Sequence, residues 1–264
     1  MDTVQSRLPE DLTLHVGHEE SLLGRIRDES ASKELVLAPV ELHRRNIQRR
    51  LRETRTPKDG VEFIDPVDVG TALLQNTDGA TKTIDRIDRL SMIRSIFLDE
   101  QQSGIGPAVP ADAQEVEQVR TEIENVSGFH PGRLDRIRDA ARDCSAPINA
   151  DSIELVDAAV DIERALRERT EKHVSEVEIV RHAIRAVRES RGELWQTTFP
   201  EVTRVSLVGV SSISAAHADL LHILLGTSSV PVHVHFRRGT GSYLSRRLPE
   251  LFDIDAPGEV VFES

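Results

Sequence analysis

Residues 204–236 read RVSLVGVSSISAAHADLLHILLGTSSVPVHVHF, and this stretch decides the fold. Its two ends, 204–209 and 231–236, are short runs rich in β-branched residues and followed by glycine or polar residues. Such runs are typical of the buried strands of a parallel sheet. The segment between them, which contains His217 and His222, is predicted to form a helix. A strand, a helix and a second strand in this order predict a parallel α/β sheet.

Four other runs of the same kind complete the predicted sheet, at 12–16, 34–38, 61–64 and 259–262. Between the third and fourth of the six runs the apolar residues recur at helical spacing, as at Ile84, Ile87 and Leu90. Residues 1–65 and 201–264 are therefore predicted to form an α/β domain with a parallel sheet of five to six strands. Residues 66–200 are predicted to form an all-helical insertion subdomain.

The net charge of the chain limits the ways in which it can bind a nucleic acid. Its 264 residues include 45 acidic and 33 basic side chains, for a formal net charge of -12. Lysine occurs only at positions 33, 58, 82 and 172, so 29 of the 33 basic residues are arginine. This composition resembles that of proteins from salt-loving archaea. A basic-tail DNA binder is excluded, but a local basic patch is not, because the Debye length falls to about 3 Å at molar salt.

The cysteine count and the hydropathy of the sequence indicate the cellular compartment of the protein. Cys144 is the single cysteine, which excludes a disulfide framework and a CxxC zinc or redox site and fits a reducing interior. No run approaches about 18 apolar residues, and residues 1–7 begin no signal peptide. The sequence therefore predicts a cytoplasmic protein with no membrane partner.

The loop after the first predicted strand, 17–24, reads GHEESLLG and is a candidate phosphate loop. Gly17, His18, Ser21 and Gly24 are the candidate cofactor-binding residues, because a glycine-rich turn at a helix N-terminus can wrap a phosphate with backbone N–H groups. A glycine at each end without the usual lysine is a degenerate version of this motif.

Two elements that ATP would need are missing from the sequence. Arg25 stands where Gly-Lys-Ser/Thr is expected, and Glu19 and Glu20 would repel a triphosphate. The strand at 205–212 ends in Gly, Val and Ser, without the carboxylate that holds magnesium. We therefore expect no cofactor, with ATP and magnesium disfavoured.

A cluster of arginines follows the second predicted strand. Arg44, Arg45, Arg49 and Arg52 are the candidate DNA-binding residues, because guanidinium groups one helical turn apart can follow a phosphate backbone. The alternative is a surface helix whose arginines pair with nearby Asp and Glu.

The remaining chemical candidates are weak. His233 and His235 share one face of a predicted strand, and His15 and His18 lie near the end of the first strand, where imidazoles could bind zinc. Ordinary sheet-edge histidines are the default interpretation. No Gly-x-Ser-x-Gly elbow is present, so no catalytic residue and no metal ligand is assigned.

The order of elements resembles the first motor lobe of UvrD-like superfamily 1 helicases, whose sheet is of the P-loop NTPase kind. The resemblance rests on the degenerate loop at 17–24, the strand end LVLAP at 35–39, and the run at 61–64 followed by IDRIDRL at 84–90, which looks like the entry to their helical 1B-type insertion. The strand at 205–209 resembles the AddB-type subunit of helicase-nucleases, in which a Walker-B strand is likewise degenerate.

The resemblance implies a non-catalytic, helicase-like accessory protein of DNA repair or recombination, with DNA and a helicase or nuclease chain as partners. The sequence departs from working helicases at Arg25 and after Val208, the two places that matter for ATP. Two alternatives stay open: a nucleotide-dependent hydrolase or transferase with an atypical phosphate loop, and a purely structural interaction module.

Overall fold

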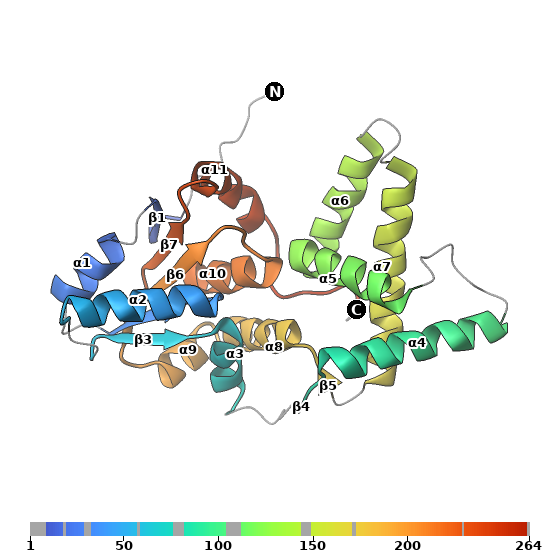
Figure 1. Cartoon of the computed structure of the whole chain (residues 1–264), viewed down its shortest axis with the longest axis horizontal. Coiled ribbons are helices and arrows are strands. Elements are labelled where there is room, and N and C mark those ends of the chain that lie inside the picture. The colour runs from blue at the N-terminus through green and yellow to red at the C-terminus, as the bar shows by residue number, and fades with distance from the viewer. Residues whose placement is uncertain are drawn as a thin grey trace. The chain divides into compact units, whose positions relative to one another are not determined.

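The computed structural model describes residues 9–17, 20–28, 33–56, 59–75, 82–103, 112–143, 149–170, 173–228 and 230–262 (Figure 1). The chain divides into two compact units. The sheet unit comprises residues 1–78, 180–213 and 217–257. The helical unit comprises residues 79–179, 214–216 and 258–264.

The sheet unit is built on five parallel strands, as the sequence predicts. Their order is β1-β7-β6-β2-β3, with bounds β1 Leu12–Val16, β2 Lys33–Leu37, β3 Val61–Ile64, β6 Val202–Val210 and β7 Val232–Phe236. Leu207 pairs with Leu37 on one side and with Val234 on the other, so β6 is at the centre of the sheet. The α/β fold class is thereby confirmed.

The sixth predicted strand, 259–262, was wrong. In the helical unit, the Val261 N–H donates to the Phe129 carbonyl at 3.1 Å, and Val260 is buried in a cluster with Phe129 and Leu134. The apolar residues of this run are thus covered by helices, without a strand ladder. A short apolar run does not by itself distinguish these two ways of being buried.

Helices α1 (Glu20–Asp28) and α2 (Glu41–Glu53) cover one face of the sheet (Figure 1). Leu22 and Ile26 of α1 and Ile47 and Leu51 of α2 pack with Val36 of β2 in one apolar cluster. The chain moves in one direction along the sheet from β1 to β3 and in the opposite direction from β6 to β7. Because crossovers are right-handed, α10 (Ala215–Thr227) lies on the opposite face.

The other helices of the sheet unit are α3 (Pro66–Leu74), α9 (Glu193–Thr198), α11 (Gly241–Phe252) and most of α8 (Glu176–Glu189). α3 has a typical helix start: the Asp65 carboxylate accepts a hydrogen bond from Val67 N at 2.9 Å, and Pro66 occupies the first turn.

The two faces of the sheet differ in polarity, because side chains alternate along each strand. One face carries aliphatic and aromatic residues such as Leu35, Leu207, Val234 and Phe236, all buried. The face under α1 is apolar only near Val36, Ala38 and Val208. Its remainder is polar, with the side chains of His15, Glu34, Arg204, Ser206, His233 and His235.

The helical unit contains α4 (Arg86–Ser103), α5 (Ala113–Ser127), α6 (Pro131–Asp143) and α7 (Asn149–Arg169). Ile93, Ile96, Val116, Ile162 and Leu166 form part of its core. The region expected to be wholly helical also contains a two-stranded parallel sheet of β4 (Lys82–Thr83) and β5 (His173–Val174). Strands of two residues leave no period in the sequence.

A buried ionic network crosses the helical unit. The guanidinium of Arg120, 1% exposed, contacts Glu117 at 2.8 Å, Glu124 at 3.1 Å and Glu163 at 2.8 Å. Arg89 contacts the same Glu117 at 2.6 Å. These contacts join α4, α5 and α7 through charges rather than apolar surface.

Candidate functional site

All five strands of the large sheet are parallel, so their carboxyl ends lie along one edge. β2 and β6 are neighbours, but the chain leaves β2 towards β3 and leaves β6 towards β7. In open α/β sheets, ligands bind outside the carboxyl ends of the strands where the direction of winding changes in this way. The carboxyl edge near β2, β6 and β7 is therefore the candidate functional site.

The predicted phosphate-loop residues are not in one loop. Gly17 directly follows β1, has a φ of 116°, and donates its N–H to Phe236 O at 3.1 Å. Ser21 and Gly24 both lie within α1, and the Ser21 hydroxyl contacts His15 Nδ1 at 3.3 Å. His18 lies outside the described residues.

Arg25 follows the predicted phosphate-loop residues in the sequence, and its side chain contacts residues of the sheet. Its Nη2 donates to Glu34 Oε1 at 3.0 Å and to Ser206 Oγ at 3.1 Å. The Glu34 side chain is 3% exposed and also accepts a hydrogen bond from the Ser206 hydroxyl. Arg204 lies 3.8 Å from the same carboxylate. The charge of Arg25 is thus neutralised inside the domain, away from the carboxyl edge.

Three histidines extend this polar cluster beneath α1. His15 Nε2 and His233 Nδ1 are 3.0 Å apart, so one ring donates and the other accepts, and His15 stacks on His235 at 4.3 Å. His235 Nε2 is 3.2 Å from Arg25 Nη2 and accepts from it. The contact with Arg25 requires a neutral His235, and the contact between His15 and His233 requires that the accepting ring be neutral, because a second proton would remove the acceptor.

The environment of these rings keeps them neutral at pH 7. Burial, followed by the positive charge of Arg25, lowers the pKa of His233 to about 3. Burial, followed by His15 and Arg25, lowers the pKa of His235 to about 2. The pKa of His15 is lowered as well, mainly by burial. The cluster is therefore a polar core for the β1–β7 end of the sheet.

The end of β6, where a magnesium-binding carboxylate is expected in a nucleotide hydrolase, is packed against α2 instead. Gly209 has φ of 70°, and an added Cβ would lie 2.6 Å from Cγ of His43. Ser211 and Ser212 follow and are exposed. This strand end offers hydroxyl groups, and residues 209–214 include no acidic side chain.

The predicted DNA-binding arginines lie on α2, and most of them have a carboxylate partner. Arg44 and Arg45 both contact Glu41, the latter at 2.8 Å, and Arg49 contacts Glu53 at 3.8 Å. Arg52 is exposed. The helix has five arginines and two glutamates, so it stays positively charged after this pairing.

The structure also reveals a surface that sequence reasoning missed, which we call the carboxyl-edge patch. It consists of exposed residues at the ends of β1 and β7 and at the starts of α2 and α11: Val16, Val40, Leu42, Arg237, Arg238 and Tyr243. A signal existed in residues 236–247, FRRGTGSYLSRR, which contain four arginines, a tyrosine and no acidic residue.

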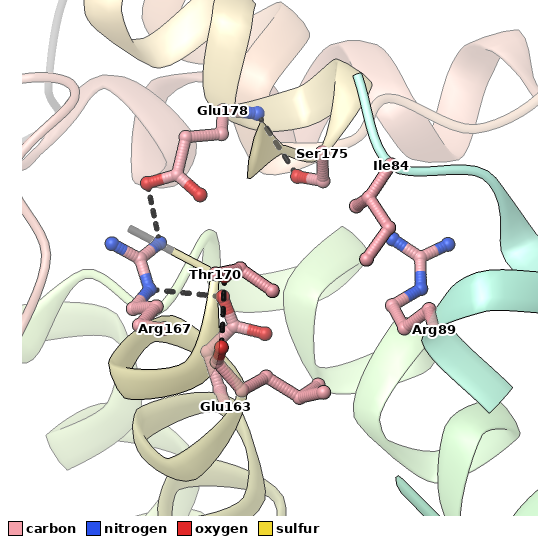
Figure 2. A pocket seen from close by; sticks show the side chains of 8 residues that line it. Ile84, Arg89, Glu163, Arg167, Thr170, Ser175 and Glu178 are labelled. Carbon is pink, nitrogen blue, oxygen red and sulfur yellow. Dashed lines mark hydrogen bonds and ion pairs between the residues drawn. The ribbon is translucent and has the colours of Figure 1, made fainter. Parts of the chain in front are cut away.

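The helical unit has a small polar pocket (Figure 2). Figure 2 shows Arg167 between Glu163 and Glu178, with contacts of 2.9 Å and 2.7 Å. The cavity measures about 30 Å³, which is room for roughly one or two water molecules. It is part of the ionic network and is too small for a cofactor.

A second hollow of about 300 Å³ lies beside it. All the residues that line it are polar or charged, with both signs of charge: Arg86, Arg89, Gln114, Glu117, Gln118, Thr121 and Glu122. Small-molecule sites are mostly apolar with a few placed polar groups. The hollow lacks that character.

Within the described ranges, no three His, Cys, Asp or Glu side chains are placed to hold a metal ion. None of the helices in the described part of the chain combines the length and hydropathy needed to cross a membrane.

The fold and the site define a class: a parallel α/β protein of the P-loop kind with a helical unit, in which Arg25 of α1 contacts Glu34 and Ser206 of the sheet. The model of the family described as "Halobacterial UvrD-like protein" matches residues 1–263. The chain belongs to this family, whose description fits a helicase-like protein of salt-loving archaea. No curated protein matches the chain.

Proposed function

We propose that this protein is a non-catalytic, helicase-like accessory protein of DNA repair or recombination, which binds DNA, a helicase or nuclease chain, or both. The observation that carries the proposal is the position of Arg25. Its guanidinium is committed to Glu34 and Ser206 in the sheet, so it is not available to the β and γ phosphates of ATP. The resemblance to AddB-type subunits, with their degenerate Walker-B strand, fits the same role.

Two further features support a silent nucleotide site. A phosphate loop needs consecutive backbone N–H groups around the phosphate, and Ser21 and Gly24 instead continue a helix. The strand that would supply the magnesium ligand ends in Gly209, Val210 and two serines. A triphosphate would therefore meet neither the cation nor the metal that its charge requires.

The proposed DNA contact is the outer side of α2, with Arg44, Arg45, Arg49 and Arg52. The side chains of their partners Glu41 and Glu53 are 48% and 64% exposed. Exposed ion pairs of this kind are worth about 0–1 kcal/mol. A phosphate backbone can therefore displace the carboxylates at little cost, and counterion release would favour that exchange.

The proposal is tested by fluorescence anisotropy with a labelled single-stranded oligothymidine at a series of KCl concentrations up to molar, because phosphate contacts weaken as salt rises, with the protein alone and with any chain that co-purifies. We expect saturable binding that Arg45→Glu with Arg49→Glu weakens. Arg136→Glu with Arg142→Glu on α6 is the matched control and should bind normally. Absence of binding in both preparations would refute the DNA role.

A thermal-shift scan with ATP and magnesium separates the proposal from a nucleotide-dependent enzyme. A ligand at 100 times its dissociation constant adds about 2.7 kcal/mol of stability, which a scan resolves easily. We expect no shift. A clear shift that depends on magnesium would favour a hydrolase or transferase instead.

A further inference from the structure

The carboxyl-edge patch concentrates the exposed apolar surface of the described chain. Seven large hydrophobic residues are exposed within the described ranges, and four of them are Val16 at 48%, Val40 at 48%, Leu42 at 63% and Tyr243 at 58%. A monomer gains nothing from exposing such side chains together. Apolar groups gathered at one place usually mark an interaction surface.

Contacts in the structure show that the patch is continuous from β1 to β2. Val16 lies against the start of α11, because an added Cβ on Gly241 would be 2.6 Å from Val16 Cγ1. Arg238 Nε is 3.9 Å from the Cβ position of Gly17, which follows Val16. Arg237 then contacts His43 of α2, which follows Leu42 directly.

The charge of the patch selects an acidic occupant. Arg237 and Arg238 are exposed, in a chain whose formal net charge is -12. Glu41, the nearby carboxylate at the start of α2, is engaged by Arg44 and Arg45. The patch therefore carries the charges of two exposed arginines, which favour an occupant with negative groups.

The apolar members favour a protein over a nucleic acid. Unpaired bases are held mainly by stacking on aromatic rings, and Tyr243 is the only aromatic residue among the six. Val16, Val40 and Leu42 are aliphatic and offer no stacking plane. Tyrosine and arginine around an apolar centre are instead enriched where proteins bind proteins. At molar salt, apolar contacts also persist when charge attraction is screened.

We propose that the carboxyl-edge patch is the docking surface for a partner protein that presents an acidic segment with apolar side chains. This inference rests on the proposed accessory role, because it names where and by what chemistry the partner binds. The patch adjoins the proposed DNA contact on α2, because Leu42 precedes Arg45 by three residues on the same helix, whereas Tyr243 belongs to α11.

A random peptide library displayed on ribosomes identifies the chemistry of the occupant without knowledge of the partner. The library is selected on the full-length protein at molar KCl and counter-selected on the variant Arg237→Glu with Arg238→Glu. We expect enriched peptides that combine Asp or Glu with Leu or Phe. A synthetic, labelled copy of the most enriched peptide is then titrated by anisotropy.

Variants of the patch give the quantitative test. Leu42→Ser and Tyr243→Ala should each weaken peptide binding about tenfold, the usual loss for a central interface residue. Leu98→Ser is the matched control, since Leu98 on α4 is 59% exposed, and it should bind normally. Urea denaturation of every variant confirms that it folds.

Three results would overturn the proposal: no enrichment, enrichment of peptides without acidic residues, or equal binding by patch and control variants. A fourth result would also overturn it: if Tyr243→Ala, on α11 and away from the arginines of α2, abolished oligothymidine binding, the occupant of the patch would be a nucleic acid. If the peptides behave as expected while oligothymidine never binds, the DNA role fails and the docking surface stands.

Discussion

Replacement of Arg25 by methionine should destabilise the protein by about 3 kcal/mol, because it leaves the buried carboxylate of Glu34 without its main cation. The Glu34 side chain is 3% exposed and that of Arg25 is 15% exposed, so water replaces little of the lost contact. Removal of one partner of a buried pair costs about 3–5 kcal/mol. We place this case at the low end, because Arg204 at 3.8 Å and the Ser206 hydroxyl still face the carboxylate.

A double-mutant cycle also removes the carboxylate of Glu34. Arg25→Met combined with Glu34→Leu replaces the pair by apolar groups of similar length, which is often close to neutral. We expect the double variant to be less destabilised than the sum of the single variants by about 2 kcal/mol.

The assay is equilibrium urea unfolding at constant molar KCl, followed by circular dichroism. Arg27→Met on the same helix is the control, since Arg27 is exposed and a surface change is usually within about 0.5 kcal/mol. The reasoning would be refuted if Arg25→Met cost less than about 1 kcal/mol, or if the two substitutions were additive. Either result would mean that Arg25 is not held in the sheet.

Three further predictions follow from buried groups and close contacts. The pKa of His235 is lowered to about 2 in the folded protein, so as the pH falls the unfolded chain takes up a proton at this residue first, and the free energy of unfolding should decrease below about pH 6.5. At about pH 5 the loss from this group is about 2 kcal/mol. His235→Leu should reduce the pH dependence of urea unfolding by that amount. Arg120→Met should cost about 3–5 kcal/mol in thermal unfolding, because Glu124 is 3% exposed and loses its contact at 3.1 Å; a change under 1 kcal/mol would show that the network is not buried in solution. Gly209→Ala should cost about 2 kcal/mol, because φ is 70° and the new Cβ would meet His43; His43→Ala should recover part of that loss, and equal urea midpoints for single and double variants would contradict the clash.

The sheet could be predicted because its strands carry their own signal. The runs at 204–209 and 231–236 are aliphatic and β-branched, and β6 and β7 formed there. The run at 259–262 has the same composition, but its apolar side chains are buried against Phe129 and its backbone does not pair with a strand. Composition reports that a segment is buried, and it does not report what covers it.

The candidate site could be predicted only where its residues are close in sequence. The sequence shows directly that Arg25 differs from the lysine of the usual phosphate-loop motif. The contact that Arg25 makes could not be predicted, because its partner Ser206 lies 181 positions away in the sequence. The carboxyl-edge patch was missed for the same reason, since the register of β1 with β7 joins Val16 to the residues after Phe236. Sequence distance hides such clusters until the topology is known.

The most direct test of an accessory rather than a motor protein is steady-state phosphate release from ATP with magnesium, at molar KCl, with and without single-stranded DNA. The account predicts release no faster than in the protein-free control under either condition. Release that DNA stimulates, and that Arg25→Met or Ser211→Ala abolishes in a variant that remains folded, would contradict it.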